Sequence, residues 1–248
     1  GPDDPAHVAR VLDAVRGEEV SHVFVTHTHR DHSPAAAEVL AATGAVSVGE
    51  GPHRPARPLE LGEINPLDSS GDTAFRPDLT IAHGETVAGA GWTMTAIATP
   101  GHTANHLAFA LAEEDLIFSG DHVMAWATSI VAPPDGAMGD YIRSLERLAV
   151  REEKIYLPGH GGPVRNAPSF VRDYIDHRLA REAAILRALE RNVGTIPELV
   201  RGIYIGLDPK LVNAASLTVL AHLEHLVENG RVATDGQVAL DSRFRLAA

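Results

Sequence analysis

The stretch VFVTHTHRDH (residues 23–32) places three histidines and an aspartate directly after an apolar run. Neutral imidazole and carboxylate groups at short, alternating spacing suit zinc, iron or manganese. A polar loop that happens to be rich in histidine is the alternative. The four residues fall immediately after a strand-like run, however, which favours a metal site at the end of a strand.

Three more strand-like runs end in the same chemistry. TAIATPGH ends at His102, LIFSGD at Asp121 and KIYLPGH at His160. Neighbouring strands in a sheet would bring these side chains together at the carboxyl ends of the strands. The sequence thus predicts one cluster of ligands contributed by four strands.

The number and spacing of these residues predict two metal ions. Residues two apart in an extended chain point to the same side, so His27 and His29 can hold one ion. Asp31 and His32 lie where the chain turns toward the next helix, and they suit a second ion. Seven ligands are too many for one four-coordinate zinc, and they fit two ions that share Asp121.

Composition limits the class of protein. A chain of 248 residues, 44% hydrophobic and 22% charged, can bury a substantial core. It has no cysteine, which excludes disulfides, a thiolate nucleophile and a zinc site built on sulfur. The sequence has no apolar run long enough to cross a membrane and no signal-like start. We therefore expect a cytoplasmic protein with no membrane partner.

The net charge of −12 is distributed unevenly. Residues 1–164 contain 10 Lys and Arg against 23 Asp and Glu, whereas residues 165–248 contain 11 against 10. The acidic first part of the chain does not attract polyanions such as nucleic acid unless bound metal changes the local electrostatic field. The second part of the chain is therefore the less repulsive surface for nucleic acid.

Apolar runs and amphipathic segments alternate over the first two thirds of the chain, which predicts an α/β domain. Residues 51–79, dense in proline, glycine and charge, are expected to form a long excursion beside the metals that shapes substrate access. Strands are expected at residues 22–26, 45–49, 92–100, 106–112, 115–120 and 153–158, and helices at 6–15, 33–42 and 139–150.

From residue 169 the pattern becomes helical. Helices are expected at 169–192, 196–204 and 210–230, followed by two short strands around Asp235 and Gly236. Three helices and a hairpin look like a small winged-helix module. We therefore predict a catalytic domain at residues 1–168 and a winged-helix-like domain at residues 169–248.

Several motifs together resemble the metallo-beta-lactamase superfamily. They are the His-x-His-x-Asp-His string, the Gly-His-Thr at 101–103, the Ser-Gly-Asp at 119–121 and the Gly-His-Gly at 159–161. Within the superfamily, TPGHTANHLAF, PPDGAMGDYIRSLERL, YLPGHGGPV and YIDHRLARE resemble the beta-lactamase-like protein 2 family, whose animal members are single-strand endoribonucleases. The resemblance covers nearly the whole chain.

This resemblance implies an αββα sandwich followed by a winged helix. Relatives carry two or more strands before the first helix, whereas this chain begins at GPDDPAHV, so we expect the first sheet to lack those strands. The resemblance also implies a first metal on His27, His29 and His102 and a second on Asp31, His32 and His160, with Asp121 shared.

A site of this kind predicts a hydrolase. Two ions about 3.5–4 Å apart can hold a bridging hydroxide and lower the pKa of bound water toward about 7. Asp31 and Asp121 are the expected catalytic residues, because Asp31 can orient the water or take its proton and Asp121 links the ions. We expect two zinc ions because the ligand set is rich in imidazole, with iron and manganese as alternatives.

The substrate is less well defined. The resemblance implies cleavage of single-stranded RNA, whereas the acidic charge favours a small ester, thioester or lactone, as in glyoxalase II-like hydrolases. Lactamases of the superfamily mostly lack an aspartate at the place of Asp121, which disfavours true beta-lactamase activity. A non-catalytic nucleic-acid-binding module is the alternative from another class, but structural metals would not need a shared carboxylate. The winged helix also leaves a homodimer open.

Other polar residues have structural explanations. His106 could orient a ligand or cap a strand, and His122 points away from its neighbour Asp121 and is not an expected ligand. The arginines at 169–192 alternate with acidic residues, so a solvent-exposed helix face explains them as well as an RNA groove does.

Overall fold

The computed structural model describes residues 1–60, 63, 65 and 68–248. The predicted helices form, and so do the predicted strands except the one expected after Gly236, with small differences at their ends; short strands also appear that the sequence did not predict. The helices are α1 (Pro5–Ala14), α2 (Ala36–Thr43), α3 (Met138–Ala149), α4 (Ala167–Glu190), α5 (Ile196–Ile203) and α6 (Val212–Glu228). The strands are β1 (His22–Phe24), β2 (Val46–Gly49), β3 (Leu79–Thr80), β4 (Thr86–Gly89), β5 (Trp92–Ala98), β6 (Leu107–Leu111), β7 (Leu116–Gly120), β8 (Ile155–Pro158), β9 (Val164–Arg165), β10 (Val232–Thr234) and β11 (Phe244–Leu246).

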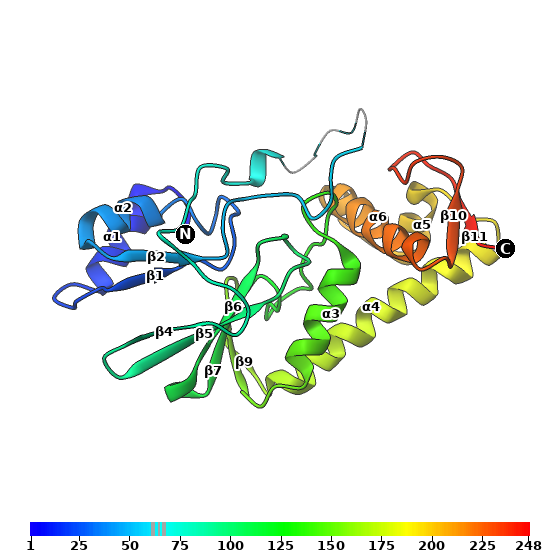
Figure 1. Cartoon of the computed structure of the whole chain (residues 1–248). Helices are drawn as coiled ribbons and strands as arrows, with labels where there is room; N and C mark the ends of the chain where they lie inside the picture. The colour runs from blue at the N-terminus through cyan, green and yellow to red at the C-terminus, as the bar shows by residue number, and fades with distance from the viewer. Residues whose placement is uncertain (61–62, 64, 66–67) are drawn as a thin grey trace.

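Two sheets packed face to face form the centre of the first part of the chain (Figure 1). The smaller sheet has the parallel order β1-β2-β3. The larger sheet has the order β4-β5-β6-β7-β8-β9 and is antiparallel except for the pair β7 and β8. Phe24 and Val48 of the smaller sheet pack in one cluster with Leu107 and Phe109 of the larger. The apolar faces of the two sheets therefore bury each other.

Helices cover the outer face of each sheet. Val8 on α1 and Val39 on α2 pack with Val23 of β1. On the other side, α3 and α4 pack against the larger sheet in a cluster that includes Ile117 and Tyr156 (Figure 1). The layers run helix, sheet, sheet, helix, which is the αββα sandwich that the family resemblance implies.

Helix α3 shows how the sequence sets this packing. Tyr141, Leu145 and Leu148 recur at spacings of three and four residues, and all three are fully buried against the larger sheet. This spacing places them on one face of the helix. The charged residues between them stay on the other face, so the helix attaches to the sheet along a single apolar stripe.

Shortening the stripe should weaken the fold. We expect Leu145→Ala to lower the free energy of unfolding by about 2–5 kcal/mol, because a fully buried leucine leaves a cavity that the sheet cannot close. Val150→Ala, at a side chain that is 82% exposed at the end of the same helix, should change it by less than about 0.5 kcal/mol. Denaturant unfolding of both variants measures the difference, and equal losses would contradict this packing.

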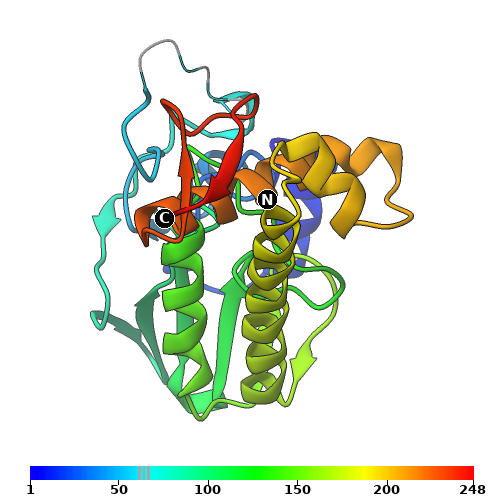
Figure 2. The same ribbon diagram turned by 90° about the vertical axis from the view of Figure 1, so that its right-hand side faces the viewer.

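Helix α4 belongs to two cores. Val171 and Tyr174 pack in the cluster under the larger sheet, whereas Ile185 and Leu189 pack with α5, α6, β10 and β11 in a second cluster. Figure 2 shows α3 and α4 side by side, with β10 and β11 above them. Although α4 is 24 residues long, no helix in the described part of the chain is apolar enough over sufficient length to cross a membrane.

The arginines of α4 are not all on a solvent-exposed face. Arg178 is only 1% exposed, and its guanidinium lies 4.7 Å from the ring centroid of Tyr141 on α3. Neither explanation left open by the sequence, an exposed helix face or an RNA groove, applies at this position, because the guanidinium is buried. The reason is that α3 lies along α4 and covers the side of the helix that carries Arg178.

The C-terminal hairpin differs from the one predicted. Val232 pairs with Leu246 and Thr234 with Phe244, so the residues that follow Gly236 form a loop and not the second strand. Burial explains this register, because Phe244 is buried in the second core. The Asp235 and Gly236 dipeptide still turns, with Gly236 at φ +97°, but it is not a two-residue hairpin turn.

The excursion at 51–79 is attached to both parts of the chain. Arg57 donates to Glu63 within the excursion and to Glu224 on α6, at 2.6–2.8 Å for its closest contacts. The amide of Ala56 donates to Pro134 O at 2.7 Å. Residues 61, 62, 64, 66 and 67 of the predicted excursion lie outside the described residues. These attachments tie the excursion to the loop before α3 and to the winged-helix region.

Candidate metal centre

The histidine-rich stretch forms a tight turn between β1 and α2. The amides of His32 and Ser33 both donate to His29 O, at 2.9 and 3.1 Å. On the other side, the amide of Asp72 donates to Thr28 O at 2.7 Å, and His29 pairs with Gly71 as an isolated bridge. The turn is therefore fixed by its own backbone and by the end of the excursion, so its side chains project from a rigid backbone.

The remaining ligand candidates follow strands of the larger sheet. His102 lies in the connection from β5 to β6, Asp121 follows β7 and His160 follows β8. Strands β7 and β8 are parallel, and the amide of Gly159 donates to Gly120 O at 2.9 Å. Both strands therefore deliver their ligands at the same edge, as the sequence predicted.

His27, His29 and His102 form a first group. Their ring centroids lie 4.6–5.1 Å apart, and His102 Nε2 is 3.0 Å from His29 Nδ1. One ligand atom from each residue lies within 4.8 Å of the others, close enough to hold one ion. This is the trio expected for the first metal.

Asp31, His32 and His160 form a second group with the same spacing of ligand atoms. His160 Nε2 lies 3.2 Å from His32 Nε2 and 3.1 Å from Asp31 Oδ2. The side chain of Asp31 is 53% exposed, so this group lies nearer to solvent than the first. It contains the three residues expected for the second metal.

Asp121 lies between the two groups. Its Oδ2 is 3.3 Å from His32 Nε2 and 3.4 Å from His160 Nε2 in the second group, and 3.9 Å from His102 Nε2 in the first. His27, His32 and Asp121 also form a trio with ligand atoms within 4.8 Å. The structure thus brings all seven predicted residues together, with the carboxylate of Asp121 in the shared position.

Unpaired buried atoms show that the cluster fits metal ions. His27 Nε2, His29 Nε2 and Asp121 Oδ1 are buried and have no hydrogen-bond partner. Such atoms are rare in folded proteins because leaving them unpaired is costly. The other ring nitrogen of His27 is occupied, since it lies 3.1 Å from Thr26 Oγ1. A divalent ion would bind an unpaired atom such as His27 Nε2, and the donor set of imidazoles and carboxylates suits zinc, iron or manganese.

The electrostatics of the first group favour metal over protons. Burial lowers the pKa of His27 well below its ordinary value and lowers the pKa of His29 to about 3. Burial also lowers the pKa of His102. These imidazoles are neutral at pH 7, which is the state that binds a metal ion.

The second group carries a proton when no cation is bound. Burial lowers the pKa of His32, but hydrogen bonds to Asp121 and Asp31 outweigh it and raise the pKa to about 9. The hydrogen bond with His32 holds the pKa of Asp31 well below its usual range. Burial raises the pKa of Asp121, but His32 outweighs this effect and the net shift is downward. Two carboxylates therefore attract positive charge to this position.

His106 holds the backbone of the shared ligand Asp121. Its Nε2 accepts a hydrogen bond from the amide of Asp121 at 3.1 Å, and its Nδ1 lies 2.8 Å from Thr99 Oγ1. The ring also stacks on His27, with centroids 5.0 Å apart. These contacts fit both roles left open by the sequence, because His106 is buried beside His27 and also pairs with the backbone amide that follows β7. His122 lies against Tyr141 in the core and is outside the metal-ligand groups, as expected.

The backbone carbonyl of Ile130 is a partner that sequence reasoning missed. His102 Nδ1 donates to Ile130 O at 2.6 Å, which fixes the ring and leaves Nε2 toward the first group. No sequence signal identifies such a partner, because any residue type offers a carbonyl. The partner depends only on the path of the loop after β7.

A cavity of about 530 Å³ opens beside the ligands. It is lined by the exposed face of the centre and by Ser69 and Ser70 of the excursion, which lies beside the site as predicted. The lining residues are His29, Arg30, Asp31, Ser69, Ser70, His102, Asp121 and Ile130. This cavity is the candidate substrate pocket.

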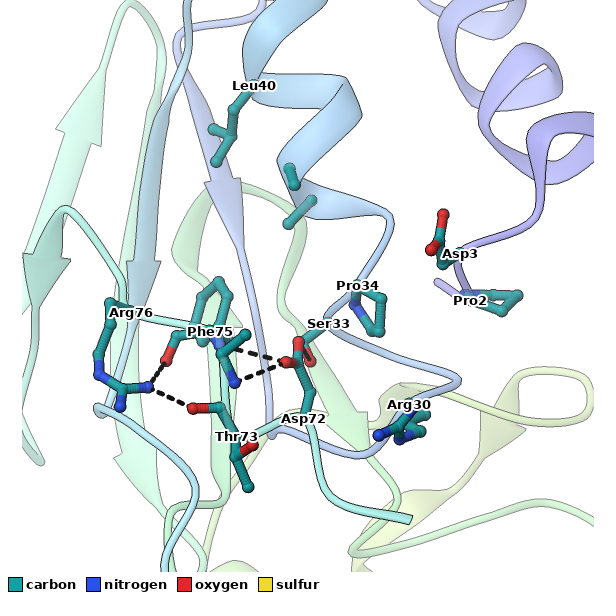
Figure 3. A pocket seen from close by; sticks show the side chains of 13 residues that line it. Pro2, Asp3, Arg30, Ser33, Pro34, Leu40, Asp72, Thr73, Phe75 and Arg76 are labelled. Carbon is teal, nitrogen blue, oxygen red and sulfur yellow. Dashed lines mark hydrogen bonds between the residues drawn. The ribbon is translucent and has the colours of Figure 1, made fainter. Parts of the chain in front are cut away.

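A larger cavity, of about 810 Å³, lies next to helix α2 (Figure 3). Asp72 is already paired there with the amides of Ala74 and Phe75 and with the Ser33 hydroxyl. Arg76 donates to two backbone carbonyls. The two cavities share Arg30 but no metal-ligand candidate lines the larger one, so it is not the reaction site.

A buried imidazole and carboxylate cluster at the strand ends of an αββα sandwich is typical of metal-dependent hydrolases. Residues 4–160 match the family model described as the metallo-beta-lactamase superfamily. The chain belongs to this superfamily. Residues 195–242 match the beta-lactamase associated winged helix domain, which confirms the winged helix predicted from the sequence.

Several known proteins are similar to this chain. The lactamase-like protein adaB of Aspergillus niger is 30% identical over 89% of this chain and 67% of its own length. The thioesterase pkgB of Emericella nidulans is 32% identical over 68% of this chain and 43% of its own length. A beta-lactamase domain protein from Burkholderia ambifaria has the same fold, with a TM-score of 0.79 at 20% identity over all of this chain and 81% of that chain.

Proposed function

We propose that this protein hydrolyses small thioesters or esters at a dinuclear metal centre. The observation that carries this proposal is the lining of the pocket beside the ligands, where Arg30 is the sole Lys or Arg among the described lining residues. Proteins that bind RNA rely on several Lys and Arg side chains to neutralise phosphates. The similarity to a protein named as a thioesterase supports the same choice.

The seven residues would bind two metal ions in two groups. His27, His29 and His102 would hold one ion and Asp31, His32 and His160 the other, with Asp121 contacting both. Bound divalent ions would polarise the substrate carbonyl and lower the pKa of water toward about 7. Asp31 is partly exposed at the pocket, so its carboxylate is placed to accept a hydrogen bond from that water and orient it.

The rim of the pocket suits an apolar acyl group. Ile130 lines the pocket with a side chain that is 44% exposed, and Trp126 on the same loop is 74% exposed. The indole lies 6.3 Å from the ring centroid of His160. Exposed aromatic surface beside a reaction site offers contact area for an apolar or aromatic substrate. Arg30 lies in the same pocket and would attract an anionic group of the substrate.

Removing the indole should weaken substrate binding. We expect Trp126→Ala to raise KM for an aryl-acyl thioester about tenfold, because it loses contact area beside His160, with kcat changed less than about twofold. Steady-state kinetics measures both constants. Ile205→Ala, at a side chain that is exposed in the winged-helix region, is the control and should change neither. A loss confined to kcat would place Trp126 outside substrate binding.

Cleavage of single-stranded RNA is the second candidate. The winged-helix match favours it, because that region has a balance of charge close to neutral beside an acidic body. A panel of substrates distinguishes thioester or ester hydrolysis from RNA cleavage. Protein of measured metal content is tested on an aryl-acyl thioester, S-lactoylglutathione, a lactone, nitrocefin, single-stranded RNA and double-stranded RNA. We expect the thioesters to be hydrolysed fastest, and efficient RNA cleavage without thioester hydrolysis would overturn the proposal.

A further inference from the structure

We propose that Arg178 on helix α4 is a positioning residue for the metal centre. It holds the loop at residues 121–130, which carries the shared ligand Asp121 at one end and the carbonyl partner of His102 at the other. The inference rests on the metal centre of the proposed function but not on the identity of the substrate. It makes helix α4 a functional part of the site.

The two ends of this loop are joined to each other. Ser129 Oγ donates to Asp121 O, and it lies 3.2 Å from His122 O. The next residue, Ile130, accepts the hydrogen bond from His102 Nδ1 at 2.6 Å. A shift of Ser129 would therefore move the backbone of one ligand and the carbonyl that orients another.

Arg178 fixes Ser129 from the side of α4. Its guanidinium donates to Ser129 O at 2.5 Å and packs over the ring of Tyr141, 4.7 Å from the centroid. The hydroxyl of Tyr141 in turn donates to His122 O at 2.6 Å. The residues at both ends of the loop are thus held by one packed pair from α3 and α4.

A tyrosine one turn earlier on α4 holds the middle of the same loop. The hydroxyl of Tyr174 lies 2.6 Å from Met124 O and 2.7 Å from Ala127 O, and it accepts from the amide of Met124. Helix α4 therefore contacts the loop at its middle as well as near its end. Contacts at several points make the loop follow the position of the helix.

Burial of the charged guanidinium of Arg178 costs free energy unless hydrogen bonds or other polar contacts compensate for the lost water. A guanidinium that is 1% exposed has lost its water, and its Nε has no hydrogen-bond partner. Its hydrogen bond to Ser129 O is charge-assisted and so stronger than a neutral one. Residues that hydrogen-bond directly to metal ligands typically change metal affinity by about 10- to 100-fold when they are replaced. Arg178 acts one contact further out, through Ser129.

The test measures metal affinity and not only activity. Zinc affinity is determined by competition with a chelator for the wild type, Arg178→Met, Arg178→Lys and Ser129→Ala, and the absorption spectrum of the cobalt-loaded proteins is recorded. We expect Arg178→Met to weaken binding of at least one ion about tenfold or more and to shift the cobalt spectrum. Arg178→Lys, which keeps a charged donor, should recover part of the affinity.

Two control variants separate positioning from general stability. Arg172→Met removes an exposed arginine of the same helix, and Val171→Ala opens a cavity at a buried residue of α4. Both should bind zinc as the wild type does, although Val171→Ala should unfold more easily. If Val171→Ala weakens zinc binding as much as Arg178→Met does, Arg178 has only a structural role.

The outcomes distinguish this inference from the proposed function. Wild-type affinity and an unchanged cobalt spectrum in folded Arg178→Met would overturn the inference and leave the metal centre intact. If Arg178→Met does not fold, Arg178→Lys decides, because it replaces the guanidinium that donates to Ser129 O, and wild-type zinc affinity with an unchanged cobalt spectrum in that variant would overturn the inference as well. A wild-type protein that binds no zinc would instead contradict the proposed function.

Discussion

Asp121→Asn is expected to lower turnover by about 10³-fold or more and to reduce the number of bound metal ions. The Oδ2 atom of Asp121 lies 3.3–3.9 Å from imidazole nitrogens of both groups, so its negative charge serves both ions. The amide has nearly the same volume but no charge, and several kcal/mol of electrostatic stabilisation would be lost.

Metal content and turnover are measured on the same preparation of this variant. Asp115→Asn is the matched control, because it makes the same chemical change at an exposed residue between β6 and β7. The control should keep both ions and full activity. Unchanged activity in Asp121→Asn would mean that the shared position of Asp121 is wrong.

His160→Ala is expected to lower turnover by about 10²-fold or more and to leave one ion bound. His160 belongs to the second group alone, whereas the three histidines of the first group keep their ligand atoms within 4.8 Å. The ion in the first group should therefore keep close to wild-type affinity. Loss of the second ion removes one of the two charges that act on the substrate.

Titration with zinc measures the stoichiometry of this variant. His83→Ala, which removes an exposed histidine before β4, should still bind two ions. Loss of both ions in His160→Ala would show that the two groups do not bind separately. Retention of two ions would exclude His160 from the ligand set.

The ligand cluster could be predicted because the ligands lie at or shortly after the ends of strands. The apolar run before His27 and the runs before Asp121 and His160 identify their own strand ends, and parallel pairing of β7 and β8 brings two of these ends together. The local sequence therefore identified which residues are ligand candidates. The pairing of strands supplied their proximity in space.

The residues that orient the ligands could not be predicted in the same way. Ile130 acts through its carbonyl, which has no side-chain signal, and Arg178 is buried only because α3 lies along α4. In the sequence, Arg178 stands among charged residues that read as an exposed helix face. The roles of Ile130 and Arg178 both depend on contacts between separate elements, which the local sequence does not reveal.

At the C-terminal hairpin, by contrast, the local sequence led to a wrong prediction of the second strand. Asp235 and Gly236 form a dipeptide typical of tight hairpin turns, and Val238 and Leu240 after it alternate with polar or small residues. Burial of Phe244 in the second core instead pairs residues 244–246 with β10. Burial of the Phe244 ring therefore outweighed the preference of Asp235 and Gly236 for a two-residue hairpin turn.

The number of metal ions bound per chain tests the central claim most directly. The protein is stripped with a chelator, supplemented separately with zinc, iron and manganese, freed of unbound metal and measured by elemental analysis, with thioester hydrolysis assayed before and after. The seven-residue cluster predicts two ions per chain for at least one metal, and hydrolysis that is lost with the chelator and returns with that metal. One ion or none per chain after every supplementation would contradict the dinuclear centre.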